Sequence, residues 1–318
     1  MPRDRRLRTG LTLVETLVVC VVIGILLTLL LTGVQAARSM ARRSACLFNF
    51  KQVALALQNY ESASKRFPAG MMRGEGWLVK ILPHIEQTAL LEEVRNHLEA
   101  SDGMPFRTPV AVYICPEDPQ HSRLGASTSM AGNTGVWPVA TGFSGMFSPI
   151  GEAFARMGYS GAGEVAIVDV SDGLSATIAI SEILHANYTQ ERLRVNWNLQ
   201  EQFGVAEGEG LRAKCESLPH APKSSGYVGD MSSRGTPWTS GDMGATLYNH
   251  LSVPNSPSCY NCTDVMSASI AASSAHSGLI NCAFADGHVT PIHSAVDLKV
   301  WREMGSRNGA DELVSDSF

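Results

Sequence analysis

An uninterrupted apolar stretch near the N-terminus dominates the hydrophobic pattern of this 318-residue chain. From Leu11 to Leu31 the only ionisable side chains are those of Glu15 and Cys20. At about 1.5 Å per residue, a helix of this stretch is long enough to cross a hydrocarbon core of about 30 Å. The pattern therefore predicts one membrane-spanning helix.

The helix is expected to continue beyond the apolar stretch. Between Val34 and Tyr60 the sequence has no glycine or proline, and apolar residues recur mostly at intervals of three and four. The run Phe67-Pro68-Ala69-Gly70 then ends the pattern. We expect one helix from about Thr12 to Ser64, about 80 Å long. Its second half is expected to be amphipathic and to pack against a globular head.

Short strands and turns dominate the head. Residues 165–170 and 176–180 predict two strands around an Asp172-Gly173 turn. Residues 281–292 predict a hairpin whose tight turn is Asp286-Gly287.

Two segments of the head are predicted to be helical instead. Residues 77–97 carry an apolar face, and residues 297–304 predict a short terminal helix. The fold class expected is therefore α+β, in which a long N-terminal helix precedes a β-rich globular head.

The ten residues before the apolar stretch form a basic leader. Four arginines against Asp4 give it a net charge of +3, and Gly10 is its last residue. Glu15 is unusual, because an acid in a spanning helix costs roughly 2.5–3.5 kcal/mol at mid-bilayer and usually persists only where it has a partner. A plain membrane anchor does not need such an acid.

The segment Gly10-Leu11-Thr12-Leu13-Val14-Glu15 closely resembles the prepilin cleavage and methylation signal of type IV pilins and type II secretion pseudopilins. The resemblance implies that a prepilin peptidase cuts between Gly10 and Leu11 and that the new N-terminus on Leu11 is methylated. It also implies that Glu15 aligns neighbouring subunits. Leu11 stands where the signal usually has phenylalanine.

This resemblance also orients the chain, which charge alone barely does because arginines flank both ends of the span. It implies a single-pass protein of the inner membrane with a cytoplasmic N-terminus and a periplasmic head. The expected parts are a leader (1–10), a transmembrane helix (11–33), an amphipathic extension (34–66) and the head (67–318). The expected partners are the prepilin peptidase and methyltransferase, other pilin-like subunits and membrane lipid.

A second series of landmarks begins just after the span and extends over nearly the whole head. It comprises Val34 to Arg38, Cys46, Asn49, Trp77 to Gln87, Tyr113 to Pro116, Gly132 to Gly135, Asp172 to Glu182, Pro254 to Cys259 and Ser273 to Gly287. The series resembles the planctomycete family DUF1559, whose C-terminal His-x9-Asp-Gly signature matches His276 and Asp286-Gly287. The family is broadly uncharacterised, so the resemblance implies an architecture more than an activity. We expect a structural role for the signature.

Cysteine usage fits an exported head. The pair Cys259-Tyr-Asn-Cys262 would suit zinc only with a second close pair or two nearby histidines, and the sequence has neither. Disulfides are therefore expected, with Cys215 paired to either Cys259 or Cys262. No metal site and no cofactor are predicted.

Other function classes find little support in the sequence. Subtracting the leader's +3 from the chain's −5 leaves −8, so the head lacks the basic surface that nucleic-acid binding requires. Phosphate loops, dinucleotide motifs and nucleophile elbows are absent from the sequence. His276, His288 and Asp286 could form a metal or catalytic site, but roles in ordering turns are favoured. We expect no enzymatic activity.

Two function classes remain. The favoured one is a pilin-like or pseudopilin-like structural subunit, processed by prepilin peptidase and held in or assembled from the inner membrane. The alternative is a membrane-tethered extracytoplasmic module that binds a ligand such as a polysaccharide. Trp137, Trp197 and Trp238 in polar, glycine-rich surroundings are what a sugar binder would use, although such residues are more often packing anchors.

Overall fold

The computed structural model describes most of the chain. The described residues are 13–72, 74–100, 106–118, 126–136, 143–150, 163–186, 191–204, 207–218, 228–230, 233–262 and 264–309. Gly10, Leu11 and Trp137 lie outside them. The chain divides into two compact units between Ser44 and Ala45.

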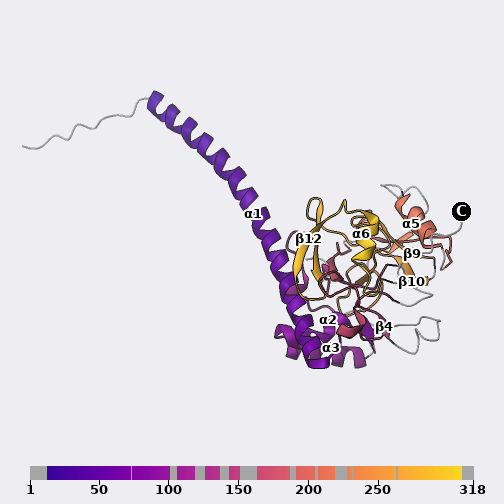
Figure 1. Cartoon of the computed structure of the whole chain (residues 1–318). Coiled ribbons are helices and arrows are strands. Elements are labelled where there is room, and N and C mark those ends of the chain that lie inside the picture. The colour runs from indigo at the N-terminus through magenta and orange to yellow at the C-terminus, as the bar shows by residue number, and fades with distance from the viewer. Residues whose placement is uncertain are drawn as a thin grey trace, which may run out of the picture. The chain divides into compact units, whose positions relative to one another are not determined.

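Helix α1 (Leu13–Ser64) begins in the first unit and ends in the second. Its first-unit residues are exposed throughout, including the large apolar side chains from Leu13 to Leu31. Within the described ranges, α1 is the one helix long and apolar enough to cross a membrane. Its first part, drawn in indigo in Figure 1, indicates a single-pass membrane anchor.

The second-unit part of α1 is amphipathic, as predicted. Its buried residues are Cys46, Phe50, Val53, Ala54, Ala56 and Leu57. Most of them are three or four positions apart, which places them on one helix face. The helix ends where Lys65 adopts a left-handed conformation with φ of 61°. Next, the Phe67 N–H donates to the Val165 carbonyl at 2.7 Å, so the predicted end of the helix is confirmed.

The strands that the structure describes in the second unit form three sheets. In spatial order, the first is β2 (Glu75–Gly76), β1 (Met71–Met72) and β4 (Pro149–Ile150). The second is β10 (Asp264–Ser269), β9 (Ser258–Asn261), β6 (Asn196–Asn198) and β7 (Val228–Asp230). The third is β12 (Val289–His293), β11 (Leu279–Phe284), β5 (Ile178–Glu182), β3 (Met130–Asn133) and β8 (Leu247–Tyr248). Strand β5 is antiparallel to both of its neighbours, β3 and β11.

Short helices connect these strands. They are α2 (Trp77–Lys80), η1 (Leu82–Ile85), α3 (Thr88–Ala100), η2 (Ala111–Tyr113), η4 (Ile167–Asp169), α5 (Gly208–Glu216) and α6 (Leu298–Glu303). The single helix predicted over 77–97 is wrong, because Pro83 lies in η1 and Glu86 takes a left-handed φ of 62°. The predicted terminal helix is confirmed as α6, which the Asp297 carboxylate caps.

The strand predicted over 165–170 is also wrong, because this segment forms the 3-10 helix η4. The Asp169 carboxylate accepts from the Ala166 N–H at 2.8 Å, while the Asp169 N–H donates to the Ala166 carbonyl at 3.0 Å. These local bonds close a turn and leave the Val168 side chain 88% exposed. The turn at Gly173 is present, with φ of 94°, and it leads to β5.

The C-terminal hairpin is confirmed. Strands β11 and β12 pair antiparallel, and Gly287 in their turn has φ of 91°, which glycine adopts without strain. The main hydrophobic core includes Phe50 and Leu57 of α1 together with Trp77. A smaller core comprises Val195, Trp197, Leu199, Leu211, Cys215, Leu218, Leu251 and Cys259. The predicted α+β class is therefore confirmed.

Candidate functional site

Four side chains with metal-binding or thiol chemistry converge in the second unit. They are Cys46 on α1, Cys115 after η2, Glu182 at the end of β5 and His276 before β11. All four are buried, and their donor atoms lie within 4.8 Å of one another. We call this group the junction cluster, because it joins α1 to the sheet that contains β5 and β11.

Hydrogen bonds hold the segment around Cys115 against α1 and against the residue that precedes β3. The Asn49 side-chain amide, on the turn after Cys46, donates to the Ile114 carbonyl at 2.8 Å. The Cys115 N–H donates to Ser129 Oγ at 2.9 Å. Cys46 and Cys115 form a disulfide with Cα atoms 4.9 Å apart and 69 residues apart in sequence. Loop-closure entropy gives such a crosslink a stabilisation of about 4 kcal/mol.

Glu182 is the buried acid of the junction cluster. Its Oε2 accepts from the Asn281 N–H at 3.2 Å and from Asn281 Nδ2 at 3.0 Å. Its Oε1 lies 3.6 Å from Cys46 Sγ and 3.6 Å from His276 Nε2. Burial raises the pKa of Glu182 to about 8, although the Asn281 hydrogen bonds oppose the rise. Asn281 on β11 therefore fixes one carboxyl oxygen and leaves the other facing the sulfur and the imidazole.

His276 completes the junction cluster from the loop that follows β10. Its backbone N–H donates to Ser274 Oγ at 2.9 Å, and its Nε2 lies 3.5 Å from Cys115 Sγ. The group thus combines two sulfur atoms, an imidazole nitrogen and a carboxyl oxygen. This donor set can form a disulfide or hold a metal ion of the zinc class.

The predicted His-x9-Asp-Gly signature spans strand β11. His276 precedes the strand and Asp286-Gly287 follow it, so the two parts lie at opposite ends of β11. At the far end, Gln58 Nε2 of α1 donates to the Ala285 carbonyl at 2.7 Å. The Asp286 carboxylate accepts from the His288 N–H at 3.0 Å. Both ends of β11 therefore lie beside α1, whereas His276 and Asp286 do not share one site.

The remaining cysteines lie outside the junction cluster. Cys215 is bonded to Cys259 across the smaller core, with Cα atoms 5.9 Å apart, which is one of the two pairings considered from the sequence. Cys262 is a free, partly exposed thiol, and Cys20 is exposed on α1. Burial raises the pKa of the Cys282 thiol to about 12, so this thiol stays protonated at neutral pH.

The tryptophans considered for sugar binding are packing residues where the structure describes them. Trp197 is fully buried in the smaller core. Trp238 is fully buried, its Nε1 donates to the Thr108 carbonyl at 2.8 Å, and its ring centroid lies 5.5 Å from that of Tyr113. Neither ring offers a free face on which a sugar could stack.

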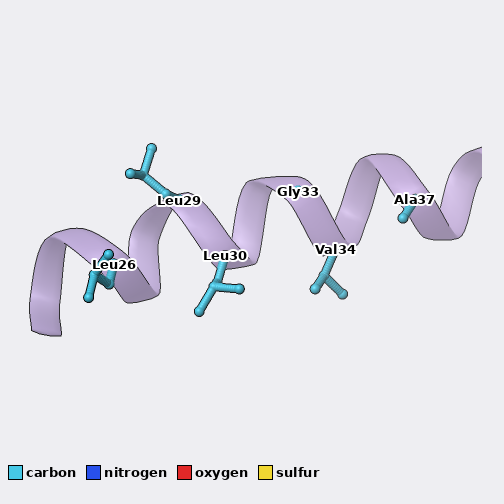
Figure 2. A pocket seen from close by; sticks show the side chains of 6 residues that line it. All are labelled: Leu26, Leu29, Leu30, Gly33, Val34 and Ala37. Carbon is cyan, nitrogen blue, oxygen red and sulfur yellow. The ribbon is translucent and has the colours of Figure 1, made fainter.

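A shallow hollow on α1 is entirely apolar. Figure 2 shows its lining: Leu26, Leu29, Leu30, Gly33, Val34 and Ala37. None of these side chains can donate or accept a hydrogen bond. The surface therefore suits acyl chains or another apolar helix rather than a polar ligand. Glu15, the predicted assembly residue, lies in the first turn of the same helix.

Sequence spacing did not predict the junction cluster. Its members come from four widely separated segments, so they form no local metal or redox motif. Each of them nevertheless falls within one of the landmark segments that resemble DUF1559. The signal in the sequence is therefore the presence of sulfur, imidazole or carboxyl groups in these segments, which these four residues share with others.

A family model described as "Protein of unknown function (DUF1559)" matches residues 35–299, which is most of the chain. The match includes every member of the junction cluster and begins after the apolar stretch. No curated protein and no solved structure matches the chain.

Proposed function

The chain belongs to the DUF1559 family, and from this premise we propose that it is a pilin-like or type II secretion pseudopilin-like structural subunit without enzymatic activity. In this proposal a prepilin peptidase removes residues 1–10 and methylates Leu11. The processed chain then sits in the inner membrane with its N-terminus in the cytoplasm and its second unit in the periplasm. Its partners are other pilin-like subunits and membrane lipid.

Two apolar sides on α1 are the observation that carries this proposal. One side is buried in the second unit and includes Phe50 and Leu57. On the other side, Phe48 is 58% exposed and Leu55 is 61% exposed, and their separation of two helical turns places them on one face. Beyond its membrane-spanning stretch, a simple anchor needs only the buried side. The exposed pair suits packing against the same helix of a second copy.

The disulfides and the single apolar helix both support this proposal. Disulfides persist mainly in oxidising compartments, and the second unit contains two of them within the described residues. The apolar part of α1 supplies a single anchor. A ligand-binding role gains no support from Trp197 and Trp238, because both are buried.

Processing and assembly are tested by substitutions at Gly10 and Glu15. We expect the wild-type chain from native membranes to begin at N-methylated Leu11 and Gly10→Ala to retain the leader. Glu15→Ala should be cleaved but should lose incorporation into multimers, because the acid acts between subunits. Intact mass and membrane crosslinking measure the two steps. Thr16→Ala is the matched control, and Gly10→Ala chains that are cleaved and assembled normally would contradict the proposal.

The exposed apolar side of α1 gives a second test of assembly. The double variant Phe48→Ala, Leu55→Ala should lose most crosslinked multimers while its free energy of unfolding changes by only about 0.5 kcal/mol per site. Phe50→Ala, on the buried side, should instead lower the free energy of unfolding by about 3–5 kcal/mol. Crosslinking yield and urea unfolding separate the two effects. Unchanged multimers in the double variant would favour the plain anchor.

A further inference from the structure

We propose that the junction cluster, in its dithiol state, binds one divalent cation of the zinc class. The ligands are Cys46 Sγ, Cys115 Sγ, His276 Nε2 and Glu182 Oε1. In the disulfide state the two sulfur atoms bond to each other instead. The site thus has two alternative crosslinks that join the same segments.

The spacing of the donor atoms fits a single ion. Zinc bonds are about 2.3 Å to sulfur and about 2.0–2.2 Å to nitrogen and oxygen, so the donors of a tetrahedral site lie about 3.3–3.8 Å apart. The four donor atoms lie within 4.8 Å of one another before any ion is added. Glu182 Oε1 already lies 3.6 Å from both Cys46 Sγ and His276 Nε2, and His276 Nε2 lies 3.5 Å from Cys115 Sγ. Closing the site around a cation needs a shift of about 1 Å for the most distant pair, and reduction lets the two bonded sulfur atoms separate to about 3.8 Å.

The surroundings already orient the ligands. Both Asn281 hydrogen bonds end on Glu182 Oε2, which leaves Oε1 as the oxygen nearest Cys46 and His276. The Asn281 amide also lies 3.5 Å from Cys46 Sγ, where it can donate to a thiolate. Hydrogen bonds of this kind, made to the ligands and not to the metal, fix the direction of the ligands and offset the negative charge of sulfur and carboxylate ligands.

Access to the site lies on the side of His276. This residue is the most exposed of the four at 8%, whereas the other three residues are at most 1% exposed. A small ion or a small reductant therefore meets the site first at His276, while the burial of both sulfur atoms excludes a protein-sized thiol reagent. When the ion binds, each thiol forms a metal–sulfur bond and releases its proton to water, and the Glu182 carboxyl releases its proton to water as its Oε1 binds the ion.

The test uses the full chain in detergent with the substitution Cys262→Ser. This background removes the pair that Cys259 and Cys262 could otherwise form after reduction. A phosphine reductant opens the disulfides: each disulfide gains two electrons and two protons, and the phosphine takes up the oxygen of one water. Co²⁺ is then added as the probe, because a cobalt–thiolate bond gives a near-ultraviolet charge-transfer band.

We expect one Co²⁺ per reduced chain, displacement of Co²⁺ by Zn²⁺ and no band in the oxidised chain. Losing a residue that only hydrogen-bonds to a metal ligand typically weakens metal binding by about 10–100-fold. Cys46→Ser and His276→Gln each remove a ligand itself, so each should weaken Co²⁺ binding at least as much. The variant His288→Gln, outside the cluster, should bind as the parent does. Circular dichroism checks that each variant is folded, and His276→Gln, which keeps both cysteines, serves if Cys46→Ser unfolds.

Absence of the band in the reduced, folded parent would overturn the proposal. A band of unchanged affinity in folded His276→Gln would overturn it too, because the imidazole would then not be a ligand. Binding that appears only when Cys262 is restored would assign the ion to the Cys259–Cys262 pair and also overturn it. None of these results depends on processing or assembly of the chain.

Discussion

Replacing Arg234 with leucine is expected to lower the free energy of unfolding of the second unit by about 5 kcal/mol or more. The guanidinium is buried and donates to five groups: the Leu184 and Ala271 carbonyls, Asn196 Oδ1, Ser258 Oγ and Ser273 Oγ. These acceptors follow β5, lie on β6 and β9, or follow β10. Arg234 therefore joins two of the three sheets through a single side chain.

The size of this loss in the free energy of unfolding follows from the buried acceptors that Arg234→Leu leaves without their donor. Burial lowers the pKa of Arg234 to about 10, which still keeps the side chain charged at pH 7. All five acceptors are neutral and buried. Ser258 Oγ and Ser273 Oγ still accept from the Ala271 and Leu184 N–H groups, whereas the two carbonyls and Asn196 Oδ1 would lose a donor that leucine cannot replace. A buried polar group without a partner costs about 1–3 kcal/mol. Because whole domains are stable by only about 5–15 kcal/mol, most of the stability would be lost.

Urea unfolding of the full chain in detergent measures this loss. Arg234→Lys should be intermediate, because an ammonium has three donors and cannot match the planar guanidinium. The control is Arg212→Leu, which removes half-exposed pairs with Glu209 and Glu216 on α5 and should cost under about 1 kcal/mol. Equal midpoints for Arg234→Leu and Arg212→Leu would contradict the role assigned to Arg234.

Acid is expected to destabilise the second unit through His250. Its Nδ1 lies 2.7 Å from the Trp301 carbonyl and its Nε2 lies 2.8 Å from the Tyr248 hydroxyl, so the neutral ring donates to the carbonyl and accepts from the hydroxyl. The ring also stacks on Trp301 with centroids 4.0 Å apart. Burial lowers the pKa of His250 from 6.5 to about 3, although the contact with the Trp301 carbonyl opposes the shift.

The sign of the pH effect follows from these two pKa values. Between pH 6.5 and 3 the unfolded chain binds a proton at His250 that the folded chain does not bind. The contribution of His250 to stability is therefore complete above pH 6.5 and falls by about 1.4 kcal/mol per pH unit below it. Glu182 acts in the opposite direction between pH 4.5 and 8, because the folded chain keeps its proton there.

Comparison with His250→Phe isolates the histidine, because Glu182 contributes equally to both proteins. The stability advantage of the wild type over His250→Phe should shrink by about 3 kcal/mol between pH 6.5 and 4. Denaturant midpoints at pH 7, 6, 5 and 4 provide the measurement. His288→Gln, which changes an exposed ring beside Asp286, should follow the wild type. A constant difference between wild type and His250→Phe at all four pH values would contradict the prediction.

Short-range patterns in the sequence predicted the helices and turns that depend mainly on interactions between residues close together in the chain. Helix α1 follows from its apolar stretch, from the apolar repeat after it and from the absence of glycine and proline between Val34 and Tyr60. The β11–β12 hairpin follows from Asp286-Gly287, because this turn needs a positive φ. Residues 165–170 also look like a strand by composition, but the Asp169 carboxylate supplies a competing local hydrogen bond.

Long-range contacts explain what the sequence could not predict. The order of strands in the largest sheet places β5 between β3 and β11, although these strands are far apart in the chain. The junction cluster depends on that order, because Glu182 ends β5 and Asn281 lies on β11. The buried role of Arg234 could not be predicted from the sequence either, because its five acceptors come from separate segments of the chain. Such residues can be found only when the segments have been placed in space.

Strand β11 also limits where this chain can accept insertions. One extra residue between His276 and Asp286 would shift the alternation of side chains along β11 and turn Asn281 away from Cys46 and Glu182. It would also displace the turn in which a Cβ at Gly287 would already lie 3.1 Å from Gln58 Cγ. An epitope tag or fluorescent probe is therefore best inserted beside the exposed Val168, far in sequence from this strand.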